Sequence, residues 1–430
     1  MKKFISILLS IVLIFSVMIT ASATDSGDID FGDIGGVAGD VDVDTYVATS
    51  DLVALRKILL SVQEAQSKKT ADVNSDEVID IRDLIRLKRI MSDVETLYYA
   101  SGITDVAGSS ADKTTWMYRV NSSGLYVREA DIVMGDGDNV IEFAQLSDFH
   151  LMAVTDDEYA NDEVLKKTYD ARKTAFSNYK ENAIRAMEFA NMYDKTVITG
   201  DVIDFLSVGS LEMLKEVLGN SDAKIAMGNH EFRKKWYDDY EDDPTTLADR
   251  YAMTQAYWPN NIHYYSEVID EKVMYIIMNN GAGSNYEKYY AEEFEYNGTI
   301  GTMDAFLAAD IATAKEKGYG ILIFQHTPIN TGDSNDNSVA QLTGSGTPGN
   351  YTSFVGSSSE GVDGAVYNLI TSNAAVIKGV FNGHMHGHYY TEINAKNSET
   401  DTEYNAVIPQ YTLTCNAYGE GSALKITVKY

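Results

Sequence analysis

The stretch Val197-Ile198-Thr199-Gly200-Asp201-Val202-Ile203-Asp204 lies near the middle of the 430-residue chain. Its β-branched start predicts a short buried strand, and Gly200 allows a sharp turn at the end of that strand. Asp201 and Asp204 then follow, where the strand is expected to emerge. Ligands of open α/β sheets bind beyond the carboxyl ends of the strands, so the two carboxylates indicate a binding site. Taken alone, the pair is also typical of a loop that leads into a helix cap.

Four other predicted strands end in side chains that can hold a metal ion. Asp148-Phe149-His150 follows Ile141–Leu146, Asn229-His230 follows Lys224–Met227, His326 follows Ile321–Gln325, and His384-Met385-His386 follows Ala375–Phe381. Five of the seven histidines of the chain lie in these motifs. Helical patterns alternate with the strands, which predicts an α/β sandwich. We expect residues 151–180 to be a polar insertion outside the core and residues 330–361 to be a long loop.

Taken in order, these motifs resemble the calcineurin-like metallophosphoesterase family over about residues 138–425. The resemblance implies a four-layer-type α/β/β/α sandwich with two divalent transition metal ions, since imidazole and carboxylate ligands suit Mn, Fe or Zn. The implied ligands are Asp148, His150 and His386 for the first ion, Asn229, His326 and His384 for the second, and Asp201 as the bridge between them. A hydroxide shared by the two ions would then attack phosphorus.

Two further residues carry catalytic expectations from the same resemblance. His230 follows Asn229, and we expect it to face the leaving group as a general acid or to stabilise charge in the transition state. Asp204 is expected to orient or charge His230, although a helix cap is the alternative role. His388 extends the last motif, and its sequence position is compatible with a supporting role or with the surface. His263, between Ile262 and Tyr264, is expected to pack in the core.

The N-terminal part contains an internal repeat at an offset of 32 residues. Oxygen-bearing side chains occupy the loop positions of an EF-hand, with Asp replacing Glu at position 12. They are Asp40, Asp42, Asp44 and Asp51 in the first loop, and Asp72, Asn74, Asp76, Asp80 and Asp83 in the second. One short amphipathic helix is expected after each loop. The sequence therefore predicts two Ca²⁺ sites.

This duplicated loop-and-helix pattern resembles a type I dockerin, the module that binds a cohesin domain, over about residues 37–95. The resemblance implies cohesin contacts from loop positions 10 and 11, which are Thr49 and Ser50 in one half and Ile81 and Arg82 in the other. Because the two pairs differ in chemistry, we expect the halves to bind one partner unequally. Residues 96–114 are rich in Ser, Gly, Ala and Thr and are expected to form a linker to a phosphoesterase domain at 115–430.

The net charge and the first residues of the chain indicate which partners the protein can bind and whether it is exported. The net charge of −30 disfavours nucleic acid as a partner, since phosphate backbones are bound by Lys and Arg. Residues 1–23 have the charged start, apolar run and Ala-x-Ala end of a signal peptide, which predicts export. No later stretch is long and apolar enough to span a membrane, and the single cysteine excludes an intramolecular disulfide.

The leading hypothesis is a secreted, extracellular phosphoesterase attached to a cohesin-bearing scaffold, with a phosphorylated small molecule or carbohydrate as substrate. The motifs leave monoester and diester hydrolysis equally open. The alternative is that the catalytic half is an inactive, metal-stabilised binding or structural module of an extracellular complex.

Overall fold

The computed structural model describes residues 39, 41–42, 47, 49–66, 68–73, 78–91, 95–99, 116–120, 125–232, 247–257, 263–279, 293–330, 361–419 and 421–430. The chain divides into two compact units, residues 1–92 and 93–430. The predicted signal peptide, most of the predicted linker and residues 331–360 of the predicted loop lie outside the described residues. Among the described helices, none has the length and apolar character needed to cross a membrane.

The N-terminal unit is built on two short helices that follow the two acidic loops. They are α2 (Thr49–Leu59) and α4 (Ile81–Met91), with the single turn α3 (Lys68–Ala71) between them. Leu55 and Leu87, at matching positions of the repeat, are fully buried and form a small core with Val41 and Val73. The helices fall where the apolar spacing predicted them, and the duplicated core explains why the two halves fold as one unit.

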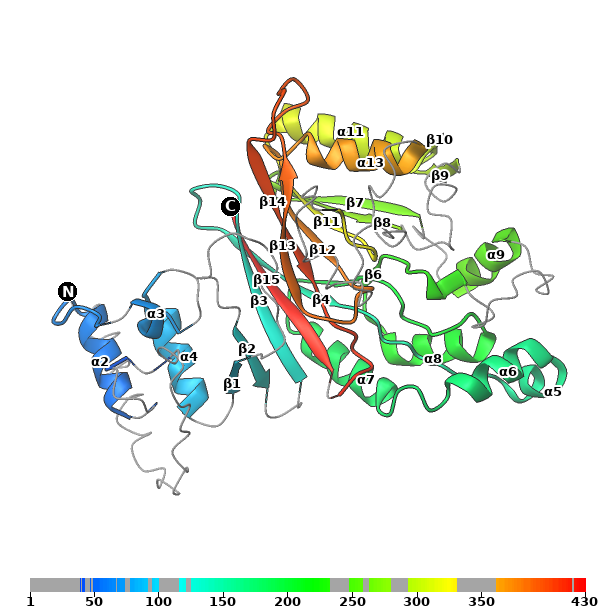
Figure 1. Ribbon diagram of the computed structural model, residues 1–430, viewed down its shortest axis with the longest axis horizontal. Helices are drawn as coiled ribbons and strands as arrows, with labels where there is room; N and C mark the ends of the chain where they lie inside the picture. The colour runs from blue at the N-terminus through cyan, green and yellow to red at the C-terminus, as the bar shows by residue number, and fades with distance from the viewer. Residues whose placement is uncertain are drawn as a thin grey trace, which may run out of the picture. The chain divides into compact units, whose positions relative to one another are not determined.

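The second unit contains two large mixed sheets (Figure 1). The first has the order β1-β2-β3-β15-β4-β5-β6 and the second the order β13-β14-β12-β11-β8-β7. The strands of the first sheet are β1 (Glu95–Tyr99), β2 (Trp116–Val120), β3 (Leu125–Val133), β4 (Val140–Leu146), β5 (Lys195–Ile198), β6 (Lys224–Ile225) and β15 (Ser422–Lys429). Those of the second are β7 (Tyr264–Ile269), β8 (Val273–Met278), β11 (Gly320–Phe324), β12 (Ile377–Asn382), β13 (Tyr389–Ala395) and β14 (Ala406–Thr412). A separate hairpin joins β9 (Phe294–Tyr296) to β10 (Thr299–Gly301).

The two sheets pack face to face through an aromatic core. Phe143 of the first sheet contacts Tyr275 and Phe324 of the second, with ring centroids 5.4 and 5.8 Å apart. Phe324 in turn stacks on Phe381 at 5.0 Å. Large rings fill such an interface and hold the sheets in register through their edge and face contacts. The sandwich therefore fixes the strand ends of both sheets relative to one another.

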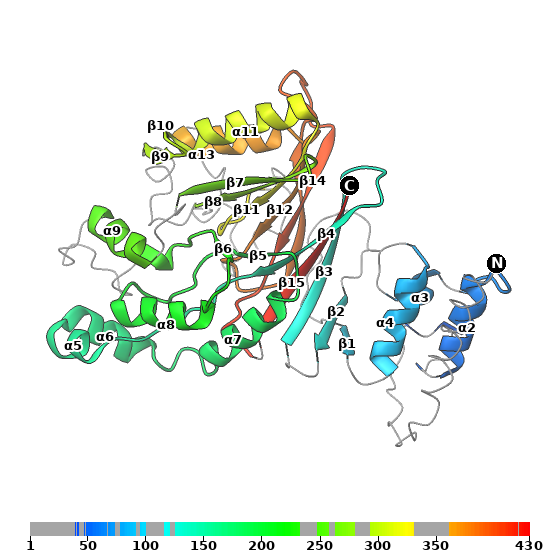
Figure 2. The ribbon, with the colours of Figure 1, turned by 180° about the vertical axis from the view of Figure 1, so that it is seen from behind.

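Helices cover the outer face of each sheet (Figure 2). The helices on the side of the second sheet are α11 (Met303–Lys317) and α13 (Gly361–Thr371), and those on the side of the first are α7 (Tyr179–Ala190) and α8 (Val208–Leu218). The remaining described helices are α5 (Asp156–Asn161), α6 (Glu163–Arg172), η1 (His230–Phe232) and α9 (Leu247–Tyr257). Apolar residues of α11 and α13 share one core with β8, β11 and β12. The α/β fold class is thus confirmed.

Local sequence signals agree with several elements. The stretch Asn121-Ser122-Ser123-Gly124 predicts a hairpin turn, and the strands on either side of it, β2 and β3, pair antiparallel. The turn between β7 and β8 uses Asp270 and Glu271, both with left-handed backbone. Helix α11 begins after Thr302 and ends at Gly318, which adopts the left-handed conformation typical of a helix C-terminus.

Three expectations need correction. Ser210 precedes a stripe of leucines, which predicts it as the N-cap of α8, but Ser207 holds that position and its side chain accepts the N–H of Ser210. The stretch expected to be a linker begins with most of β1, which pairs with β2. Residues 151–180 are more than a polar insertion, since Leu165 and Phe176 are buried in a core cluster with Cys415. Leu165 lies in α6 and Phe176 in the loop that follows it, so no single helical or strand period in the sequence predicts that both are buried.

Candidate metal centre

The loops that follow β4 and β5 continue side by side beyond the strands. The N–H of Asp148 donates to the carbonyl of Gly200 at 2.9 Å, and the N–H of His150 donates to that of Asp201 at 2.9 Å. Leu151 then forms an isolated parallel bridge with Ile203. Main-chain hydrogen bonds therefore bring the Asp-x-His motif next to the carboxylate pair, as expected for parallel neighbours whose carboxyl ends share one edge.

An unusual backbone conformation marks the predicted ligands. Five of the seven have a positive φ, namely Asp148 (53°), His150 (47°), Asp201 (47°), His384 (69°) and His386 (53°). The left-handed region costs a non-glycine residue about 1–2 kcal/mol. Strain of this kind gathers at functional sites, where the surrounding structure imposes it. Here it turns each side chain inward immediately after a strand.

The first group of side chains, which we call the first half-site, consists of Asp148, His150 and His386 with Asp201. The Nε2 atoms of His150 and His386 lie 3.1 Å apart and 3.8 and 3.3 Å from Oδ1 of Asp148. That oxygen is buried and accepts no hydrogen bond from the described residues. Ligand atoms of all four residues lie within 4.8 Å of one another, a set that can surround one cation.

The second half-site consists of Asn229, His326 and His384, again with Asp201. Nε2 of His326 lies 3.1 Å from Oδ2 of Asp201, 3.1 Å from Nδ1 of His384 and 3.3 Å from Oδ1 of Asn229. Asp201, His326 and His384 form a second group of potential metal ligands within 4.8 Å. Asp201 belongs to both groups, which is the position required of a bridging carboxylate.

The hydrogen bonds of the imidazole rings leave particular nitrogens available to a metal. Nδ1 of His326 lies 2.8 Å from the carbonyl oxygen of Thr199, and Nδ1 of His150 lies 2.9 Å from Oδ1 of Asp204. Both oxygens only accept, so each Nδ1 carries a proton, and in the neutral ring each Nε2 has the lone pair that a metal would take. Metal-binding histidines are commonly oriented in this way. The donor set therefore fits two divalent ions.

His230 lies at the edge of the same centre. Its Nε2 is 3.8 Å from Oδ2 of Asp201, and its Nδ1 is 2.6 Å from the carbonyl oxygen of Asp204. The carboxylate of Asp204 instead bonds to His150, with Nδ1 of His230 farther away at 3.6 Å. Asp204 thus contacts two histidines, one through its side chain and the other mainly through its main chain, whereas the sequence associated it with His230 alone.

The charges of the centre perturb one another strongly. Burial by itself would raise the pKa of Asp201, but the facing histidines, His326 first, lower it well below its ordinary value. Burial opposes the protonation of His326, yet Asp201 outweighs it and raises the pKa of His326 to about 9. Burial and the neighbouring His326 lower the pKa of His384 to about 3. Burial also opposes ionisation of Asp148, but His386 and His326 lower its pKa. A centre that keeps buried carboxylates ionised among imidazoles is suited to cations.

Gly200 and Gly383 allow the close packing that the centre requires. Gly200 has a φ of +88°, and a Cβ there would lie 2.6 Å from Nδ1 of His326. A Cβ at Gly383 would overlap Ser147 and the carboxylate of Asp148. The glycines in these motifs therefore serve the approach of backbone to ligand side chains, in addition to the turn at the end of a strand.

A family model for calcineurin-like phosphoesterases matches residues 141–388, more than half of the chain. The chain belongs to the calcineurin-like phosphoesterase family. Its members hydrolyse phosphate esters, so the chain is a hydrolase. A model for type I dockerin domains matches residues 38–92, which confirms the second resemblance. No curated protein sequence matches the chain.

Solved structures give only distant similarities to this phosphoesterase. A dimetal phosphatase from Danio rerio shares 14% identity over 65% of this chain and 88% of its own length, with a TM-score of 0.35. PhoD shares 10% identity over 70% of this chain and 61% of its own, with a TM-score of 0.34. Both scores lie below 0.5, and these similarities say nothing about the substrate of this phosphoesterase.

Two supporting residues of the phosphoesterase domain had no role assigned from sequence. Glu231 is fully buried and accepts N–H groups from Asp201 at 3.1 Å, Ile203 at 3.2 Å, and Gly228. It thereby joins the loops after β5 and β6. Arg172 of α6 reaches Asp204 from the segment judged to be an insertion. Glu231 could have been suspected from its place beside His230, but no spacing in the sequence connects Arg172 to Asp204.

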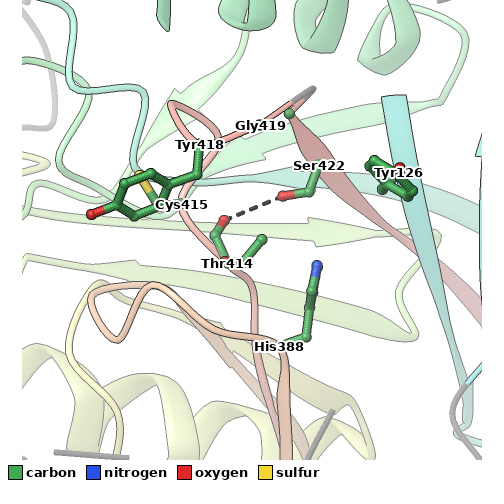
Figure 3. A pocket seen from close by; sticks show the side chains of 8 residues that line it. Tyr126, His388, Thr414, Cys415, Tyr418, Gly419 and Ser422 are labelled. Atoms are coloured by element: carbon green, nitrogen blue, oxygen red, sulfur yellow. Dashed lines mark hydrogen bonds between the residues drawn. The ribbon is translucent and has the colours of Figure 1, made fainter. Parts of the chain in front are cut away.

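His388 lines a pocket of about 180 Å³ together with Tyr126, Thr414 and Ser422 (Figure 3). Cys415 and Tyr418 also line it. The thiol of Cys415 donates to the carbonyl of Asp148 at 3.3 Å, and the ring of Tyr418 lies 5.4 Å from that of His386. Burial lowers the pKa of His388 to about 3. His388 is therefore neutral, and it shares this pocket with Cys415 and Tyr418, which contact Asp148 and His386. His263 is partly buried and stacks on Phe294.

Some of the predicted calcium ligands lie among the described residues of the dockerin domain. Asp51 is fully buried and accepts the N–H groups of Val41 at 2.6 Å and Asp42 at 3.1 Å. Asp83, its repeat partner, accepts the N–H of Asp80 at 2.7 Å. These bonds close each loop onto the start of the following helix. The other predicted ligands are Asp72, which is buried, and Asp40, Asp44, Asn74 and Asp76, which lie outside the described residues.

The four predicted cohesin-contacting residues lie at equivalent places in the repeat. Thr49 and Ser50 begin α2, and Ile81 and Arg82 begin α4. All four are exposed. Arg82 also pairs with Asp80, Nη2 to Oδ2 at 3.0 Å, which gives the second half a charged contact of its own.

Proposed function

We propose that the chain is a secreted, two-metal phosphoesterase held on a cohesin-bearing scaffold by its dockerin domain. The observation that carries the enzymatic part is the position of Asp201, which belongs to both groups of potential ligands and lies 3.8 Å from His230. Two bound divalent ions would supply positive charge to the phosphate and lower the pKa of bound water. The donor set is compatible with Mn, Fe or Zn.

Under this proposal, metal binding and proton donation would be carried out by different residues. Asp148, His150 and His386 would hold one ion, Asn229, His326 and His384 the other, and Asp201 both. The carbonyl of Asp204 keeps the proton of His230 on Nδ1, so Nε2 of a doubly protonated His230 can give a proton to the leaving oxygen. This assignment needs no covalent intermediate, because phosphoryl transfer depends mainly on positioning and charge.

The test is hydrolysis of p-nitrophenyl phosphate and bis-p-nitrophenyl phosphate by purified protein supplied with Mn²⁺, Fe²⁺ or Zn²⁺. We expect metal-dependent turnover of at least one ester and its loss in Asp201→Ala. The ratio of the two rates would separate monoesterase from diesterase activity. Absence of turnover on both esters with every metal, from protein that binds metal, would favour an inactive binding module instead.

The dockerin domain supports the tethering part of the proposal. Two Ca²⁺ ions would be held by the carboxylate loops that Asp51 and Asp83 close, and the cohesin contacts would come from the starts of α2 and α4. Titration of the full chain with type I cohesins should show binding in Ca²⁺ that disappears in EGTA. A matched pair of variants, Ser50→Asp and Arg82→Asp, should reduce binding unequally. Equal affinity with and without Ca²⁺ would contradict this tethering mechanism. The phosphorylated small molecule or carbohydrate that serves as substrate would then be met on or near the scaffold.

A further inference from the structure

Arg172 is the last residue of α6 and forms a two-pronged ion pair with Asp204. Its Nε lies 2.7 Å from Oδ2 of the carboxylate, and its Nη2 lies 2.7 Å from Oδ1. The Asp204 side chain is fully buried, and only 14% of the Arg172 side chain is exposed. Bidentate pairs of this geometry fix orientation as well as charge, because the planar guanidinium matches the plane of the carboxylate.

The same carboxylate contacts a residue of the first half-site. Oδ1 of Asp204, which receives one prong of the arginine, also lies 2.9 Å from Nδ1 of His150. Arg172, Asp204 and His150 therefore form a continuous line that ends at the predicted metal ligand. Because Arg172 fixes the carboxylate, the carboxylate can fix the tilt of the imidazole ring and the direction of its Nε2 lone pair.

Phe176 supports both ends of this line. Its ring stacks on that of His150, with centroids 4.8 Å apart and planes at 28°. The guanidinium carbon of Arg172 lies 5.4 Å from the centre of the same ring. Both supporting side chains come from residues 151–180, the segment whose sequence carries no recognisable site motif. Residues 151–180 thus support His150 in two ways. Arg172 fixes the Asp204 carboxylate that contacts Nδ1 of His150, and Phe176 stacks on the imidazole ring.

We propose that Arg172 is a positioning residue for His150, acting through Asp204, and that the segment 151–180 thereby sets the metal affinity of the first half-site. The inference rests on the proposed two-metal function. The effect should be confined to the first half-site, because among the described residues Asp204 forms no hydrogen bond with Asn229, His326 or His384. Loss of Arg172 leaves a buried carboxylate short of donors, so Asp204 and His150 will both reorient.

The first test is calorimetric titration of the metal-free full chain with Mn²⁺. In Arg172→Met we expect one of the two sites to weaken by about 10-fold to 100-fold, the usual effect of removing such a support, while the other keeps its affinity. The Mn²⁺ affinity of Arg172→Lys should lie between those of the wild type and Arg172→Met, because an ammonium group replaces two contacts by one. The matched control is Lys173→Met, which removes the same charge from a neighbouring exposed pair with Asp170 and should bind as the wild type.

A double-mutant cycle tests whether the arginine acts through Asp204. Because neighbouring residues of one network are not additive, Arg172→Met should change Mn²⁺ affinity less than 2-fold when Asp204→Asn is already present. Circular dichroism of each variant checks the fold, and Arg172→Lys replaces Arg172→Met in the cycle if the latter is unfolded. Wild-type affinity at both sites in Arg172→Met, or equal losses in the two backgrounds, would overturn the inference.

The same titration distinguishes failure of this inference from failure of the proposed function. Metal affinity is read without any substrate. Wild-type protein that binds two ions and hydrolyses neither ester would overturn the phosphoesterase proposal, while the variants would still report on Arg172.

Discussion

The two half-sites are supported by different parts of the molecule. In the second, His326 is oriented by the carbonyl of Thr199, a main-chain oxygen directly after β5. In the first, His150 is oriented by the carboxylate of Asp204, which is fixed in turn by Arg172. The second half-site is therefore a product of the sheet itself. The first depends on side chains from a segment outside the sheets.

Solvent exposure does not separate the two half-sites. His150 and His326 are both fully buried, and each half-site has one partly exposed histidine, His386 in the first and His384 in the second. The difference lies in the supports, because those of His150 come from outside the sheets. Under the two-metal proposal, substitutions in one segment outside the sheets would alter one half of the centre and leave the other unchanged. Four predictions test the comparison.

The largest effect is expected at the residue that both half-sites share. Asp201→Asn keeps the size of the side chain but removes the charge that faces both groups. Turnover should fall by roughly 10³-fold, because two-metal charge stabilisation amounts to several kcal/mol. Mn²⁺ titration should show both sites weakened. A variant in which only one site weakens would show that Asp201 belongs to a single half-site.

Variants of single half-sites should separate the two ions. His150→Ala and His326→Ala are each expected to lower the metal content from two ions per chain to one, with turnover falling by roughly 10²–10³-fold. Metal analysis after gel filtration measures the content. If either variant loses both ions or neither, the half-sites are not independent and the comparison fails.

His230 should affect chemistry without affecting metal content. His230→Gln retains a polar side chain but cannot donate a proton from an imidazolium, and turnover should fall by about 10²-fold, the lower end for general acid catalysis. Both ions should remain. Two phosphate monoesters that differ in the pKa of the leaving alcohol should respond differently. The ester with the more acidic leaving group should lose less activity, because its leaving oxygen needs less protonation. Equal losses on these two monoesters would argue against a general acid.

Proton release should distinguish the second half-site. Asp201 raises the pKa of His326 to about 9 against the effect of burial, and a metal binds only the neutral ring nitrogen. Below that pH, His326 must lose a proton before the metal can bind. Mn²⁺ affinity should therefore rise about tenfold per pH unit and level off above about pH 9. His150→Ala, which keeps only the second half-site, is the protein to titrate between pH 6.5 and 9.5. Constant affinity between pH 7 and 8 would contradict the assignment.

Much of the centre could be predicted because its ligands follow strands directly. A buried β-branched run, a glycine and a polar residue form a local pattern, and parallel strands then bring such ends together. The dockerin repeat was equally local, since each helix begins at a fixed distance from its loop. These features depend on neighbours within about a dozen residues, which a sequence displays.

The missed features depend on distant partners. Arg172 and Asp204 are separated along the chain by one helix, α7, and one strand, β5. Ser207 rather than Ser210 caps α8 because its own backbone is extended there. The alternating pattern of residues 410–430 predicts antiparallel strands, whereas β15 pairs in parallel with β3 and antiparallel with β4. Periodicity shows that a strand exists but contains no information about its neighbours.

The most direct measurement for the whole account is anomalous diffraction from crystals of the full chain grown with Mn²⁺. Two peaks about 3.5–4 Å apart are expected, the spacing of two-metal sites. One should lie among Asp148, His150 and His386, the other among Asn229, His326 and His384, with Asp201 between them. A single peak, or two peaks that do not share Asp201, would contradict the two-metal centre.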